Sequence, residues 1–161
     1  MKKIALSKKS ISFVVFSLIA LIVISYFTMI AIRKSKFENM IDKYYYLLAC
    51  GDYDNAVDLI YYKPEHVSVK DFYLQELNTN GTPIIGCEII WTKHIGIGLY
   101  QSYVRMIDGY DNDTSYKFFF EENGNWMMAA AQFELPDKYQ TNPNLQIDER
   151  IFSPDDVTLL N

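Results

Sequence analysis

The sequence predicts an α+β protein with an N-terminal transmembrane helix followed by three helices packed on a curved, four-stranded antiparallel sheet. Three observations support this fold class. Residues 11–32 are apolar without a charge, a Pro or a Gly. From Phe37 to about residue 80, apolar residues recur with the spacing of amphipathic helices, and after Gly81 the spacing changes to the alternation of strands. Helices that precede a run of sequential strands are typical of an α+β domain, in which the helices cover one face of the sheet.

The first predicted element is a membrane span from Ile11 to Ile32, preceded by a basic tail at residues 1–10. At a rise of about 1.5 Å per residue, this helix can cross a hydrocarbon core of about 30 Å. The stretch that follows, TMIAIRKSK, has no small-x-small cleavage site, which favours an uncleaved signal anchor. Four lysines precede the span and three basic residues follow it, so the positive-inside rule predicts a cytoplasmic N-terminus and a C-terminal domain outside the cell membrane.

The stretch LLACG at residues 47–51 has the form of a lipoprotein lipidation box. A lipobox requires an apolar segment that leads into its cysteine, whereas charged residues such as Glu38 and Asp42 precede Cys50. We therefore expect Cys50 to be an ordinary helix residue. Cys50 and Cys87 could pair in an exported domain, but core packing is the simpler interpretation, and their spacing does not indicate a metal site.

Charge divides the chain into two parts. Residues 1–36 hold 7 of the 15 Lys and Arg residues and no acid, whereas residues 37–161 hold the other 8 and all 20 Asp and Glu residues, a net charge of −12. Nucleic acids and anionic lipids are bound through clustered Lys and Arg, so an acidic body is expected to bind neither. Its length is sufficient for one small domain with its own core.

Three helices are expected in the body. Apolar residues at helical spacing predict the first at 37–48, which Gly51 ends as a left-handed cap. The second is DNAVDLIYY at 54–62, which stops before a proline. The third is 68–77, for which Ser68 serves as the N-cap.

Four strands are expected to follow, at 84–93, 99–108, 115–122 and 125–134, with Asn-Gly as the last hairpin turn. Strict alternation in the first strand places Ile85, Cys87, Ile89 and Trp91 on one face. The remaining residues, 135–161, are polar and interrupted by prolines, which predicts an irregular C-terminal tail.

The order of elements resembles the nuclear transport factor 2-like superfamily, also called cystatin-like or ketosteroid-isomerase-like. The resemblance rests on YYLLACGDYDNAVDLI as a helix, a Gly-Asp turn and a second helix, and on FFFEENGNWMMAAA as the final hairpin, and it covers residues 37–134. Many membrane-anchored Gram-positive members are small extracytoplasmic domains without known catalysis. Some serve as single-span assembly components of secretion and conjugation machines, which this chain resembles in architecture alone.

Enzymes of that superfamily place Asp, Tyr and His in a cone-shaped pocket. Neither His66 nor His94 has an acidic residue at a spacing that indicates a catalytic dyad, so we expect no catalytic, cofactor or metal residues. If the odd positions face inward, a small-ligand pocket would be lined by Trp91, Gln101, Tyr103 and Arg105. Alternatively, Arg105 lies at an open rim, solvated or paired with a carboxylate.

Two functions follow from these expectations. The first is a non-enzymatic, membrane-anchored docking or assembly factor of the cell envelope, which requires an exposed apolar patch or a docked tail. The alternative is a small-ligand-binding or enzymatic pocket domain, which requires a cavity with convergent polar groups.

Overall fold

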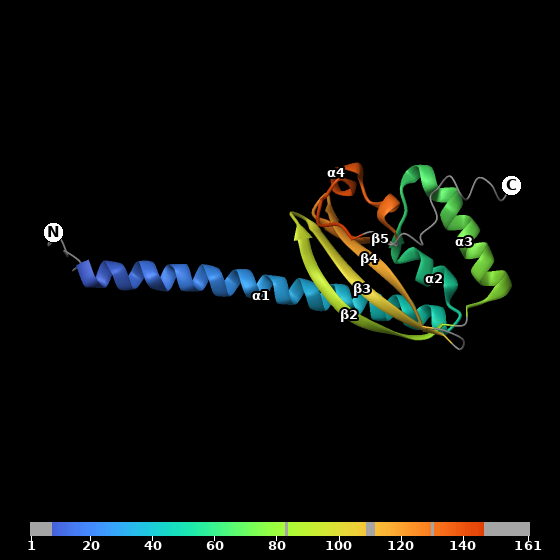
Figure 1. The fold of residues 1–161 in the computed structure, drawn as a ribbon, viewed down its shortest axis with the longest axis horizontal. Helices are drawn as coiled ribbons and strands as arrows, with labels where there is room; N and C mark the ends of the chain where they lie inside the picture. Colours follow the sequence, from blue (N-terminus) through green and yellow to red (C-terminus); the bar gives the residue numbers. More distant parts are fainter. Residues whose placement is uncertain (1–7, 83, 109–111, 130, 147–161) are drawn as a thin grey trace. The chain divides into compact units, whose positions relative to one another are not determined.

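The structure is a computed structural model that describes residues 8–82, 84–108, 112–129 and 131–146. The chain forms two compact units, with the boundary between Ser35 and Lys36. The predicted α+β class is confirmed, with one apolar helix near the N-terminus and a sheet domain after it (Figure 1).

Helix α1, Lys8–Ala49, is continuous because no Pro or Gly interrupts it. The predicted span and the first predicted helix of the body are therefore parts of one helix. From Ser12 to Ile32 the first unit is mostly apolar, and many of its large apolar side chains are exposed, Phe13 and Phe16 each by 73%. This part of α1 is long and apolar enough to cross a membrane, either as an anchor or as a signal sequence.

Gly51 ends α1 as the sequence predicts. Its φ is +76°, which favours glycine. The amide of Asp52 donates to the carbonyl of Leu47 at 2.9 Å, and that of Gly51 donates to Leu48 at 3.1 Å. These two hydrogen bonds form a Schellman motif, so LLACG is the last turn of a helix.

The second helix is shorter than predicted. Helix α2 covers Tyr53–Asp58, and the next residues form strand β1, Ile60–Tyr61, which pairs in parallel with the last strand of the sheet. Ile60 is buried in the main core. Burial and sheet pairing therefore override helical spacing for these two β-favouring residues.

The third helix begins earlier and ends later than predicted. A 3-10 turn, η1, covers Pro64–His66, and helix α3 covers Val67–Asn80. The N-cap is His66, without a side-chain hydrogen bond, so the prediction that Ser68 caps this helix is wrong. Gly81, with φ +69°, ends α3.

The sheet has five strands instead of the predicted four. Strands β2 (Ile84–Gly96), β3 (Leu99–Asp108), β4 (Asn112–Glu122) and β5 (Asn125–Ala129) form an antiparallel meander in the order β1-β5-β4-β3-β2 (Figure 1). Asn123 and Gly124 both have positive φ, 51° and 79°, as expected for a two-residue hairpin turn. The predicted all-antiparallel arrangement is wrong at β1, which makes the sheet mixed.

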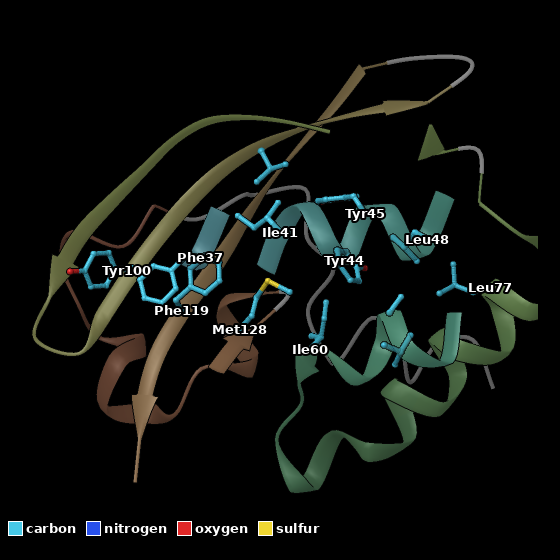
Figure 2. Packing of buried hydrophobic residues seen from close by; sticks show 13 residues of the cluster. Phe37, Ile41, Tyr44, Tyr45, Leu48, Ile60, Leu77, Tyr100, Phe119 and Met128 are labelled. Carbon is cyan, nitrogen blue, oxygen red and sulfur yellow. The ribbon is translucent and has the colours of Figure 1, made fainter. Parts of the chain in front are cut away.

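Each face of the sheet is covered by a different part of the chain. On the first face, the last part of α1 packs with α2 and α3, and Phe37 stacks on Phe119 with ring centroids 4.4 Å apart. Figure 2 shows these rings beside Tyr100, with Leu48 and Leu77 further along the same cluster. On the second face, Phe118 and other apolar residues pack against the segment after β5.

We call that segment, residues 131–146, the C-terminal arm. It includes residues 131–134, the end of the predicted last strand, and residues 135–146, the part of the predicted irregular tail that the structure describes. It contains a 3-10 turn, η2 (Gln132–Glu134), and helix α4 (Asp137–Gln140). Leu135 is fully buried against the second face. The last part of the tail, 147–161, lies outside the described residues.

Candidate functional site

Strand β2 does not follow the strict alternation expected from the sequence. Its pairing with β3 shifts register between Ile84 and Gly86, between Ile89 and Trp91, and between His94 and Gly96. Each irregularity adds a residue to β2 and exchanges the faces of the residues that follow. Cys87 and Ile89 consequently pack on the first face, whereas Ile85 is exposed and Trp91 packs with Tyr103 of the second face.

Exposed isoleucines lie at two of the three bulges of β2 and in the turn that follows this strand. Ile85 is 69% exposed, Ile90 is 40% exposed, and Ile97, in the turn after β2, is 96% exposed. We call these three residues the isoleucine row. Strand β2 is the last strand of the sheet, so among the described strands its outer edge has no partner. Exposed apolar residues on an unpaired edge strand form an interaction surface or an aggregation hazard.

The four predicted pocket residues have different environments. Trp91 stacks on Tyr103 at 5.8 Å, and the Tyr103 hydroxyl donates to Thr114 Oγ1 at 2.9 Å. Arg105 Nη1 lies 2.6 Å from Glu88 Oε2, and both side chains are largely exposed, which matches the alternative in which Arg105 pairs with a carboxylate. A groove of about 350 Å³ is lined by Trp91 and Gln101 but not by Tyr103 or Arg105.

Gln101 holds the C-terminal arm instead of facing an open pocket. Its side chain is fully buried, Nε2 donates to the carbonyl oxygen of Gln146 at 2.6 Å, and Oε1 accepts from the amide of Gln146 at 3.2 Å. Asn142 and Asn144 both donate to the carbonyl of Ile95, each at 3.3 Å. The arm is thus hydrogen-bonded to β2 and β3.

A second surface pocket, here called the α3 cavity, is open to solvent, has a volume of about 290 Å³ and is lined by residues of α1, α3, β4 and the arm. Its polar lining residues are Tyr44, Tyr62, Tyr73, Lys117 and Glu134, and its apolar ones are Val69, Phe72, Ala131 and Phe133. The hydroxyls of Tyr44 and Tyr73 lie 3.2 Å apart, at hydrogen-bond distance. Burial raises the pKa of Tyr62, and the nearby Tyr73 and Glu134 raise it further, so this phenol remains a hydrogen-bond donor at neutral pH.

Lys117 is the basic residue of this cavity, and the sequence analysis did not identify it. It lies in the middle of β4 with only 6% of the residue exposed, and its Nζ is 5.2 Å and 5.6 Å from the ring centroids of Tyr44 and Tyr45. Among the described residues, no hydrogen bond or ion pair reaches this ammonium. The neighbouring run Phe118-Phe119-Phe120, apolar on both faces, is the sequence signal that could have indicated a covered lysine.

The structure also forms a His-Glu pair that the sequence did not reveal. His66 Nδ1 lies 3.0 Å from Glu134 Oε1, and the amide of Lys63 donates to Glu134 Oε2 at 2.7 Å. The two partners are 68 positions apart, which is why local spacing gave no indication of the pair. Both carboxylate oxygens are engaged, so Glu134 links η1 to η2. His94 packs on the ring of Tyr100 instead, with centroids 4.8 Å apart.

A larger groove, of about 580 Å³, opens beside Trp126, Met128 and the first turn of α3. Its lysine, Lys70, is paired with Asp58 at 2.8 Å, so this groove presents no unpaired cation. Both cysteines are free thiols, with Cys50 exposed. Within the described residues, no three or more His, Cys, Asp or Glu side chains gather to form a metal site.

No protein-family model, curated protein or solved structure matches this chain. An apolar N-terminal helix followed by a sheet domain is compatible in general shape with an anchored member of the nuclear transport factor 2-like superfamily.

Proposed function

We propose that this protein is a non-enzymatic docking factor of the nuclear transport factor 2-like type, held by α1 in the cell membrane with its α+β domain outside. The observation that carries the proposal is the isoleucine row. A β-branched apolar side chain at 96% exposure, as for Ile97, contributes nothing to the domain's own core. Covering the row with an apolar surface of a partner would remove this area from water.

The expected occupant is a different protein, with an apolar centre and basic surroundings. Two features disfavour a second copy of this chain. The bulges of β2 interrupt the regular hydrogen-bond ladder that edge-to-edge pairing requires. In addition, residues 37–161 contain 8 basic and 20 acidic residues, so two copies of this domain repel each other electrostatically, whereas a positively charged partner is attracted.

A site-specific cross-linking experiment tests this proposal. A photoreactive amino acid replaces Ile85, Ile90 or Ile97 in the full-length chain, expressed in its native membrane. The control position is Gln75, an exposed polar residue on α3. We expect one discrete adduct from the row and none from Gln75, because the partner covers the edge of β2.

A second substitution shows whether the adduct depends on the apolar surface. The change Ile90→Asp should remove the adduct formed from Ile97, because it introduces a charge into the centre of the contact. Three outcomes would overturn the proposal: no adduct from any row position, the same adduct from Gln75, or an adduct with twice the mass of the chain.

A further inference from the structure

The buried polar residues among the described ones differ in whether their side chains have a hydrogen-bond partner. Four such residues are buried: Gln101, Ser102, Lys117 and Glu134. Gln101 binds the backbone of Gln146, Ser102 lies 2.8 Å from Thr92 Oγ1, and Glu134 binds His66 and Lys63. Lys117 is the exception, since no described residue accepts a hydrogen bond from it.

The stem of Lys117 is buried, but its ammonium reaches the solvent, because no buried side-chain nitrogen among the described residues lacks a hydrogen-bond partner. The ring faces of Tyr44 and Tyr45 attract the Lys117 cation, but a ring face does not replace the oxygen acceptors that three N–H donors require. The same ammonium borders the α3 cavity. An anionic group that enters this cavity replaces water on the ammonium and adds an opposite charge.

The other lining groups define the chemistry of such an acceptor. Tyr44, Tyr62 and Tyr73 line the cavity. One hydroxyl of the Tyr44–Tyr73 pair donates to the other, which leaves the second hydroxyl of that pair and the Tyr62 hydroxyl as possible donors to an anion. Glu134 adds a negative charge to the lining, and its two oxygens already accept from His66 and Lys63, which disfavours a ligand of high negative charge. Phe72, Phe133 and their apolar neighbours offer a surface for a hydrocarbon or aromatic body.

We propose that the α3 cavity binds a small monocarboxylic acid, with its carboxylate on Lys117 and the tyrosine hydroxyls and its apolar body against Phe72 and Phe133. The volume of about 290 Å³ is at the lower limit of pockets that hold drug-sized molecules, so the ligand is smaller than these. This inference does not depend on the docking proposal, because the cavity and the isoleucine row use different residues.

Ligand-observed NMR on the purified full-length protein in detergent tests the inference. The probes are benzoate and hexanoate, each compared with its uncharged amide, and inorganic phosphate as a competitor. At least one carboxylate should bind tenfold or more tightly than its amide, because the amide oxygen is a neutral acceptor and only the anion also pairs its charge with Lys117. Phosphate should not displace it, because phosphate has no apolar body.

Two variants assign the binding to this cavity. Lys117→Met keeps an unbranched apolar stem and should weaken carboxylate binding at least tenfold. Tyr73→Phe removes one hydroxyl and keeps the ring, so a smaller weakening of a few fold is expected. The matched control is Lys93→Met, which removes an exposed lysine that lies over Trp91. Circular dichroism verifies that each variant is folded.

The inference would be overturned if each amide bound as well as its acid, or if no carboxylate bound at millimolar concentration. Equal displacement by phosphate would also contradict it, because the site would then recognise charge alone. If Lys117→Met were folded and bound the carboxylate with wild-type affinity, the binding site would lie elsewhere.

Discussion

At the scale of single residues, the two cysteines differ in what surrounds their thiols. Cys50 is exposed at the end of α1, whereas Cys87 is half-buried on the first face of the sheet. Burial, followed by the negative charge of Asp42, raises the pKa of the Cys87 thiol to about 11. The Cys87 Sγ also lies 3.7 Å from Asp42 Oδ1. Because the thiolate is the reactive form, the two positions should differ in alkylation rate.

We predict that iodoacetamide at pH 8 modifies Cys50 and leaves Cys87 largely unmodified in the folded full-length protein. With a pKa of about 11, about one Cys87 thiol in a thousand is ionised at pH 8. Peptide mass spectrometry over time measures both rates. The variant Asp42→Asn should accelerate modification of Cys87, because it removes a charge that opposes ionisation. Equal rates at the two cysteines in the wild-type protein would show that this description of Cys87 is wrong.

At the scale of elements, Glu134 connects two short turns that are distant in sequence. Its carboxylate accepts from the backbone amide of Lys63, which precedes η1, and contacts His66, the last residue of η1. The side chain itself is in η2 and is 1% exposed. Short 3-10 turns have weak internal hydrogen bonding, so this contact fixes where the C-terminal arm begins.

We predict that Glu134→Leu lowers the free energy of unfolding by about 1–3 kcal/mol, because it leaves the partly buried Lys63 amide without its acceptor. Glu134→Gln should cost less, since the amide oxygen can still accept from Lys63. Urea unfolding of the full-length protein measures the change. Glu76→Leu on the exposed face of α3 is the matched control and should change stability by about 0.5 kcal/mol or less. A Glu134→Leu variant as stable as this control would mean that the Glu134 contact does not stabilise the fold.

The elements also show which features the sequence could predict. Gly51 and the Asn123-Gly124 turn have strong local preferences, and each ends or joins an element as predicted. The bulges of β2 could not be predicted from the sequence. The strand is rich in Ile with or without an added residue, but each added residue moves the side chains that follow it to the opposite face of the sheet. Strand β1 was also missed, since two residues carry little periodicity and their pairing partner, β5, is far along the chain.

The candidate sites were less predictable than the fold, because they depend on contacts between distant segments. Alternation along β3 placed Gln101 and Tyr103 on one face, but it did not reveal that the arm covers Gln101. The link between Glu134 and His66 joins residues 68 positions apart. The alternation along β4 predicts which face of the sheet Lys117 lies on. It does not predict the cavity beside Lys117, because residues of α1 and α3, distant in sequence, form much of the lining.

At the scale of the whole molecule, the chain combines an apolar helical segment with an acidic domain. The segment of α1 before Lys36 is long and apolar enough to cross a membrane, and no acidic residue is present in residues 1–36. The proposed docking function requires that this segment stays attached and that the domain is outside. A cytoplasmic domain would present the isoleucine row to a different set of partners.

The most direct test of this claim is labelling of Cys50 with a membrane-impermeant maleimide in intact cells. Cys50 is a free, exposed thiol in the acidic domain, so its accessibility reports the side of the membrane on which the domain lies. The account predicts labelling of the full-length protein without permeabilisation, and loss of the label in Cys50→Ser. Labelling that occurs only after the cells are permeabilised would place the domain inside and contradict the proposed function.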